Sequence, residues 1–292
     1  MKITNHYGLP TPLVRAVTSH KYDKGGADYS VTELIKPPRI VALEKLHWNE
    51  LEEDASDRLW ALMGSAGHEV LRRSSEGGIV EERCVIEVDG KKVSGQLDYA
   101  VADEAIIDYK FTSVWAVKDG VKIEWEQQLN CYKYMAEQYG VNVKELKIIA
   151  ILRDWNINEA KRNPELPQAQ VVVLPARIWP KEAVENWLRR RIALHENARS
   201  GVLPDCTPEE MWTRPSKFAI KKPGNKRASK LCDSYDEAVK LRAPNQIIEQ
   251  RPEQRVRCDN YCPVSSVCSQ YAEFKKMFAL QGGQDEGDVS EE

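Results

Sequence analysis

The segment from residue 79 to residue 113 constrains the fold most, because strand periodicity occurs there three times with only short turns between. Residues 85–88 lead into Asp89-Gly90, which is the strongest short signal for a two-residue hairpin turn. A second strand extends to about Val101, and a third covers residues 105–111. No helix fits between these strands, so the segment predicts an antiparallel three-stranded meander.

Helical patterns surround this meander. Apolar residues recur at helical spacing over residues 40–75, which indicates two helices, and residues 123–139 and 180–199 indicate two more. Residues 146–152 and 171–174 are apolar enough for buried strands. Upstream, Ser30 and Glu33 have the spacing of a helix start, and Pro37-Pro38 is expected to stop that helix. The order of elements predicts an α/β fold, a mixed sheet flanked by helices.

The composition is that of a soluble protein without a membrane segment. Of 292 residues, 42% are apolar and 30% are charged, and no run has the length of a membrane span. The first residues lack the apolar core of a signal peptide, so we expect a cytoplasmic protein. In that reducing compartment, the seven cysteines are expected to be ligands or buried thiols. Cys84 and Cys131 fall in predicted core elements and are expected to be buried.

The character of the chain changes after residue 200, where prolines and cysteines become frequent. This predicts a loop-rich C-terminal segment over residues 201–280 that needs a staple, meaning a cross-link such as a metal centre bound by cysteines. The expected organisation is an N-terminal segment (1–39), a core (40–200), this C-terminal segment, and a disordered acidic tail (281–292).

The net charge of −3 hides an uneven distribution, because five acids lie in the last eight residues. The stretch 217–230 contains six basic residues and no acid. Such a stretch suits a polyanionic partner, although a solvated surface is the alternative. The candidate nucleic-acid contacts in it are Lys217, Lys221, Lys222, Lys226 and Arg227.

Three charged residues interrupt the predicted meander. Asp108 and Lys110 are two apart, so on a strand they face the same side. A three-residue loop at 102–104 would place Asp98 opposite Asp108, whereas a two-residue turn would split the two aspartates between faces. Converging carboxylates need a cation, and oxygen ligands suit Mg²⁺ or Mn²⁺. A neighbouring lysine can orient water or stabilise charge on a phosphate. The alternative is an exposed hairpin with scattered charges.

Asp98 followed by Asp108-Tyr109-Lys110 resembles the motif of the PD-(D/E)XK nuclease superfamily. Two further elements resemble its RecB-like branch, which includes CRISPR-adaptation and phage exonucleases. These are His68, at the end of Gly64-Ser65-Ala66-Gly67-His68, and Gln128 with Tyr132 in a Gln-x3-Tyr element. The resemblance implies a restriction-endonuclease-like fold. It also implies a metal site formed by His68, Asp98, Asp108 and the Tyr109 carbonyl, with Lys110 activating water and Gln128 and Tyr132 assisting.

Cys258, Cys262 and Cys268 form a cluster that can bind one metal centre if a fourth ligand exists. Cys206, in a turn, is the preferred fourth ligand, and Cys232 is the other candidate. The arrangement resembles the [4Fe–4S] staple of RecB-like nucleases. The spacing of this chain differs from the usual Cys-x2-Cys-x5-Cys, which leaves zinc as an alternative.

Together these features predict a metal-dependent DNA exonuclease acting on single-stranded DNA or DNA with free ends, used in recombination or DNA-end processing. The phage or mobile-element setting and a helicase or recombination partner are implied only by the resemblance. Two alternatives stay open: a structure-specific endonuclease, and a non-catalytic, metal-stapled DNA-binding protein.

Overall fold

The computed structural model describes residues 1–19 and 23–282, and the chain divides into two compact units. The first unit contains residues 1–42 and 48–203, so residues 1–39 belong to the same unit as most of the predicted core. The second unit contains residues 43–47 and the chain from Pro204 onward. Of the expected tail at 281–292, the part from residue 283 lies outside the described residues.

A five-stranded sheet in the order β10-β9-β8-β7-β4 forms the centre of the first unit. Its strands are β4 (Ile79–Val80), β7 (Tyr99–Val101), β8 (Ala105–Thr112), β9 (Glu145–Leu152) and β10 (Val171–Ala176). Strands β8 and β9 are parallel, and the other neighbours are antiparallel. The sheet is therefore mixed, which confirms the predicted α/β class.

The sequence predicts one three-stranded meander in a single sheet, but in the structure its strands are divided between two sheets. A second sheet has the order β2-β6-β5. Its strands are β2 (Tyr29–Ser30), β5 (Arg83–Val88) and β6 (Lys91–Gln96). The division arises because both strands of the first hairpin bend, one at Glu81-Glu82 and the other at Leu97-Asp98. Glu81 has a φ of 50°, in the left-handed region, which turns the backbone between β4 and β5.

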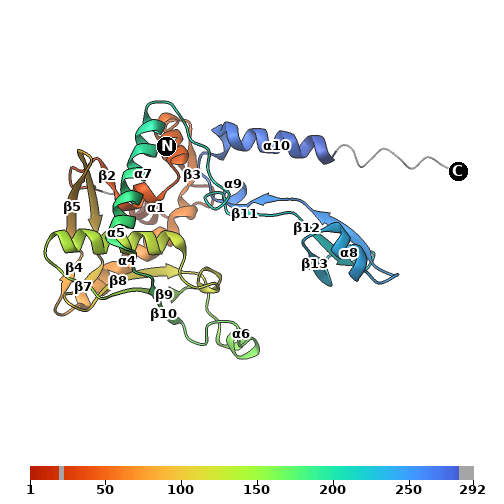
Figure 1. Cartoon of the computed structure of the whole chain (residues 1–292), viewed down its shortest axis with the longest axis horizontal. Helices are drawn as coiled ribbons and strands as arrows, with labels where there is room; N and C mark the ends of the chain where they lie inside the picture. Colours follow the sequence, from red (N-terminus) through yellow and green to blue (C-terminus); the bar gives the residue numbers. More distant parts are fainter. Residues whose placement is uncertain (20–22, 283–292) are drawn as a thin grey trace. The chain divides into compact units, whose positions relative to one another are not determined.

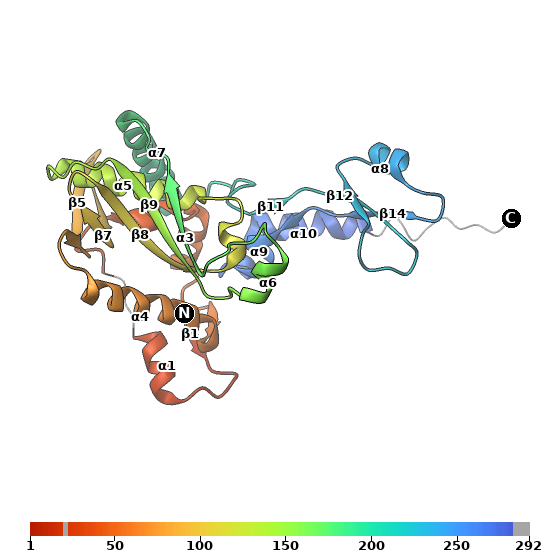
Figure 2. The same cartoon turned by 90° about the horizontal axis from the view of Figure 1, so that it is seen from below.

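Helices cover both faces of the central sheet (Figures 1 and 2). Helix α5 (Ile123–Gln138) packs on β8 and β9 from one side, with Leu129 and Met135 fully buried. Helix α4 (Leu59–Ser74) packs against β8 from the other side, as Figure 2 shows. Cys84 and Cys131 are both buried in this core, as predicted.

Helix α7 (Lys181–Arg199) packs against α5 and against α2 (Val31–Ile35). Ser30 caps α2 as predicted, since its hydroxyl accepts a hydrogen bond of 3.1 Å from the Glu33 amide. Helix α2 ends before Pro37, but Pro38 begins the next helix, α3 (Pro38–Leu46). Proline is tolerated there because the first residues of a helix need no intrahelical donor.

The pattern read as two helices over 40–75 also contains a strand, β3 (Glu52–Asp54), parallel to β1 (Lys2–Thr4). Partners far away in sequence stabilise this strand, so local periodicity could not show it. The remaining elements of the first unit are α1 (Thr11–Thr18), η1 (Ala55–Arg58), η2 (Val114–Val117) and α6 (Ile157–Arg162).

Most elements of the second unit are short. Its elements after Pro204 are β11 (Thr213–Arg214), β12 (Lys217–Lys221), β13 (Lys230–Cys232), α8 (Tyr235–Leu241), β14 (Ile247–Arg251), β15 (Gln254–Arg255), α9 (Val256–Asn260), η3 (Ser265–Val267) and α10 (Ser269–Gly282). Ile220, Cys232 and Ala238 form a small cluster under the sheet β13-β12-β14. Within the described residues, no helix has the length and apolarity needed to cross a membrane.

Candidate active site

The loop between β7 and β8 has three residues, 102–104, as the convergent geometry requires. Val101 pairs with Ala105, and Tyr99 pairs with Ile107. Continuing this register by one step places Asp98, which directly precedes β7, opposite Asp108. Asp103 in the loop adopts a φ of 60°, which aspartate tolerates better than most residues. The two aspartates identified in the sequence are therefore cross-strand neighbours.

The first hairpin adds a third acid to this row, one that the sequence analysis missed. The turn at Asp89-Gly90 pairs Val88 with Lys91, and the same register continues through the bend to pair Val80 with Tyr99. It places Glu81 opposite Asp98, and the Glu81 amide donates a 3.1 Å hydrogen bond to the Asp98 carbonyl. Counting outward from the Asp89-Gly90 turn would have shown this pairing from sequence alone.

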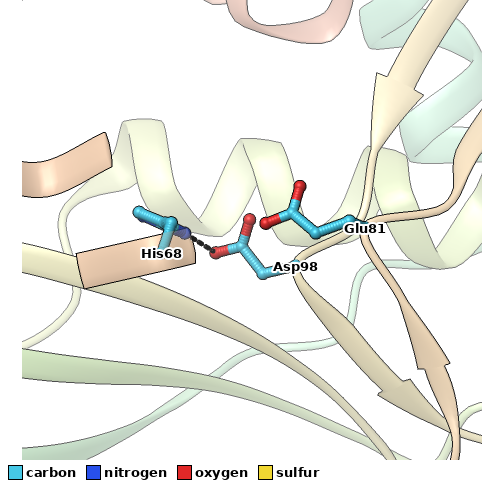
Figure 3. Close-up of side chains that lie close together, drawn as sticks. All are labelled: His68, Glu81 and Asp98. Carbon is cyan, nitrogen blue, oxygen red and sulfur yellow. Dashed lines mark ion pairs between the residues drawn. The ribbon is translucent and has the colours of Figure 1, made fainter. Parts of the chain in front are cut away.

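His68 on α4 completes a group of potential metal ligands with Glu81 and Asp98 (Figure 3). Its Nδ1 lies 3.4 Å from Asp98 Oδ2, and one ligand atom from each of the three residues lies within 4.8 Å of the other two. Next to His68, α4 approaches β8 closely, because a Cβ on Gly67 would lie 2.0 Å from Phe111 Cζ. Glycine at this position allows α4 to hold His68 against the sheet.

The electrostatic environment of this group disfavours charge. The pKa of Asp98 is raised to about 7, mainly by burial and next by the nearby negative charge of Asp108. A 2.9 Å hydrogen bond from the Tyr109 amide to Asp98 Oδ2 opposes this shift. Burial also lowers the pKa of His68, which favours the neutral imidazole needed for metal binding. A cation would relieve the cost of holding these carboxylates together.

Asp108 is not part of that three-residue group, but lies beside it in contact with Lys110. It is only 1% exposed, and its Oδ2 lies 2.7 Å from Lys110 Nζ. This Oδ2 makes no aligned hydrogen bond among the described residues, so the contact is an ion pair. A buried carboxylate oxygen left without a hydrogen bond is uncommon in proteins, and it fits a further cation ligand.

Lys110 is held by the Gln-x3-Tyr element of α5. Its Nζ donates a 2.9 Å hydrogen bond to Gln128 Oε1, and Gln128 Nε2 donates a 2.8 Å hydrogen bond to the Tyr132 hydroxyl. Gln128 and Tyr132 are four residues apart and therefore lie on the same face of the helix. The structure thus brings the predicted lysine, glutamine and tyrosine into one chain of hydrogen bonds.

The backbone of Tyr109 lies close to the group of potential metal ligands. Its amide donates a 2.9 Å hydrogen bond to Asp98 Oδ2. The rings of His68 and Tyr109 meet edge to face, with centroids 6.4 Å apart. The Tyr109 backbone therefore lies beside the three potential ligands.

In the second unit, the four cysteines of the predicted staple influence one another electrostatically. The pKa of Cys206 is raised to about 12, mainly by burial, next by the charge of Glu210, and then by Cys268, Cys258 and Cys262. Gln270 holds the backbone of Cys206 with two hydrogen bonds of 3.0 Å. Cys232 lies instead in the small core with Ile220 and Ala238. Cys206 is thus the upstream cysteine near the other three.

The predicted nucleic-acid contacts fall into two groups. Lys217 forms an ion pair with Asp233, and Lys221 forms one with Glu249, so acids of the same unit neutralise both. Lys222, Lys226 and Arg227 lie in the connection between β12 and β13, and we find no ion pair for them among the described residues. These three are the better candidates for contact with a polyanion.

Comparisons with known proteins found only weak structural similarities. No protein-family model matches the chain, and no curated protein matches it. The crystal structure of SSO0001 is similar with a TM-score of 0.41 and 17% identity, covering 63% of this chain and 83% of that one. A crystal structure named "Putative exonuclease" from Eubacterium rectale has a TM-score of 0.31 and 12% identity, covering 49% of this chain and 55% of that one. We therefore base the interpretation of the site on its own geometry.

Proposed function

We propose that the protein is a metal-dependent nuclease that hydrolyses phosphodiester bonds in DNA. The observation that carries this proposal is the meeting of His68, Glu81 and Asp98 within 4.8 Å, beside the buried pair of Asp108 and Lys110. Clustered carboxylates, a neutral imidazole and one positioned lysine form a donor set that suits a divalent cation and an anionic substrate.

The residues have distinct roles in this proposal. His68, Glu81, Asp98 and Asp108 would hold Mg²⁺ or Mn²⁺, and the carbonyl of Tyr109 is a further candidate ligand. A bound cation would activate water and neutralise charge on the phosphate. Lys110 would orient the attacking water and stabilise negative charge that develops on the phosphate. Gln128 fixes the position of the Lys110 ammonium, and Tyr132 fixes Gln128.

The more specific form of the proposal is an exonuclease acting on single-stranded DNA or on DNA with free ends, in recombination or DNA-end processing. The sequence motifs that resemble RecB-like exonucleases support this form. A structure-specific endonuclease would use the same residues. The two are distinguished by comparing end-labelled linear DNA with circular single-stranded DNA, since an exonuclease leaves the circle intact.

We also propose that Cys206, Cys258, Cys262 and Cys268 hold a structural [4Fe–4S] cluster in the second unit. The mutual electrostatic influence of the four thiols and the resemblance of their arrangement to the staple of RecB-like nucleases support this proposal. Zinc bound by the same four cysteines is the alternative.

The activity is tested by incubating the purified protein with labelled DNA and Mg²⁺ or Mn²⁺, with chelator as a control. Asp108→Asn keeps the volume of the buried side chain but removes its charge, so we expect cleavage to fall at least about 100-fold, as for loss of a metal ligand. Asp103→Asn, in the exposed loop of the same hairpin, is the matched control and should cleave normally. Wild-type cleavage by Asp108→Asn, with normal folding by circular dichroism, would refute the site.

A further inference from the structure

An apolar groove lies next to the candidate active site, on the α4 side of the sheet. It has a volume of about 420 Å³, within the range of small-molecule sites. Trp60, Met63 and Val70 of α4 line it, together with Phe111 of β8 and Arg153, which follows β9. The lining contains one cation and no acid.

The groove and the site share their supporting residues. Gly67 lines the groove and directly precedes His68, while Phe111 lines it and directly follows Lys110. The rings of His68 and Phe111 are 5.7 Å apart. A ligand in the groove would therefore lie beside His68, at the edge of the candidate metal site.

The groove exposes side chains that a folded domain normally buries. Trp60 is 56% exposed, Met63 60% and Val70 63%. They recur along α4 at positions that face the same side, so the exposure is a continuous stripe of the helix. Exposed apolar stripes of this kind mark binding surfaces more often than scattered apolar residues do.

The position of Arg153 indicates what kind of ligand fits. Its guanidinium carbon lies 4.1 Å from the centre of the Trp60 ring, and we find no ion pair for it among the described residues. An indole with an uncompensated guanidinium beside it matches the two parts of a nucleotide, an aromatic base and an anionic phosphate. A purely apolar partner segment would leave the charge of Arg153 without a counterion.

We propose that this groove binds an unpaired base next to the scissile phosphate, with the base stacked on Trp60 and Arg153 contacting the adjoining phosphate. A paired base cannot enter, because its faces are covered by neighbouring base pairs. The groove thus selects single-stranded substrate or the frayed end of a duplex. This inference rests on the proposed nuclease function, since it places the groove beside a phosphate in the active site.

The experiment measures binding in chelator, without cleavage, of a labelled single-stranded oligonucleotide and of the matching duplex. Trp60→Ala should weaken binding of the single strand about 5- to 100-fold, as for loss of one stacked base. Binding of the duplex should change less than about twofold. Trp115→Ala is the matched control, because Trp115 is also exposed, also has a cation (Lys118) beside its ring, and lies outside the groove.

A second measurement links the indole to one base. An abasic site is introduced at each position of the oligonucleotide in turn. At one position it should weaken binding to the wild-type protein, and at that same position it should not change the affinity for Trp60→Ala. Unchanged single-strand affinity in Trp60→Ala, or an equal loss for duplex, would overturn the inference. Failure of Asp108→Asn to affect cleavage would instead refute the proposed site, while a Trp60-dependent loss of single-strand binding would still show that the groove binds bases.

Discussion

Glu81 and Asp98 lie opposite one another on the two strands of a bent hairpin, and both carboxylates face His68. The register that joins them is set by the Asp89-Gly90 turn, and the register that joins Asp98 to Asp108 is set by the loop at 102–104. Two independent turns therefore align three acids across neighbouring strands. Each turn fixes one pairing, so a one-residue slip in either would move an acid to the other face.

The opposition of Glu81 and Asp98 predicts that Glu81 contributes to metal affinity. Glu81→Gln should raise the Mn²⁺ concentration needed for half-maximal cleavage by about tenfold or more, the effect typical of a lost ligand or ligand partner. Glu82→Gln is the matched control, because Glu82 is adjacent and exposed. Calorimetric titration of both variants with Mn²⁺ would measure the effect directly. Equal affinities would remove Glu81 from the proposed site.

The contacts of Lys110 predict a loss of turnover rather than of binding. In Lys110→Met, kcat should fall by roughly 100-fold or more, because the ammonium acts on charge that develops in the transition state. KM should change little. Gln128→Leu should give a smaller fall in kcat, since Lys110 would remain but lose its 2.9 Å hydrogen bond. A rise in KM at unchanged kcat would show that Lys110 only binds substrate.

Buried His195 predicts a loss of stability in mild acid. Its side chain packs against Tyr29 and the Leu34 carbonyl and is 2% exposed. Burial, and next the charge of Arg191, lower its pKa to about 4. Below pH 6.5, His195 is therefore protonated in the unfolded chain but stays neutral in the folded chain. The free energy of unfolding falls as the pH drops.

Between pH 7 and pH 5 this group should contribute a loss of about 2 kcal/mol. Asp98 acts in the opposite direction, because its raised pKa makes the folded chain bind the extra proton in this range. The measurement is therefore the free energy of unfolding in urea, determined for wild type and for His195→Gln at pH 7 and at pH 5 in the presence of chelator. The difference between the two proteins isolates the contribution of His195. A difference that does not change with pH would contradict the prediction.

The grouping of the cysteines predicts which variant loses the proposed cluster. Protein purified without oxygen should contain about four iron atoms per chain. Cys206→Ser should lose iron, and thermal unfolding should show destabilisation of the second unit by several kcal/mol. Cys232→Ser, which changes a residue of the small core, should keep its iron. One zinc and no iron would refute the cluster, and loss of iron only in Cys232→Ser would show that Cys206 is not the ligand.

The sequence alone was sufficient to predict features that depend on a few consecutive residues or on the length of a turn. The strand and helix periods gave the α/β class, Ser30 with Glu33 gave a helix start, and the spacing of Asp108 and Lys110 gave their common side. The three-residue loop could be proposed from the sequence because strand pairing follows directly from loop length. The pairing of Glu81 with Asp98 could be predicted in the same way from the Asp89-Gly90 turn. No sequence motif, however, marks Glu81 as a site residue.

Tertiary structure decided everything that depends on which distant segments meet. The bend at Glu81 divided the predicted meander between two sheets, and β3 formed because β1 pairs with it. The contact of Gly67 with Phe111, which holds His68 against the sheet, joins residues of α4 and β8. Pairing partners, burial and pKa shifts arise from packing between elements, whereas periodicity and turn chemistry are properties of a few consecutive residues. The sequence by itself therefore determined the elements and the candidate residues, and only the packed fold determined which of them share one site.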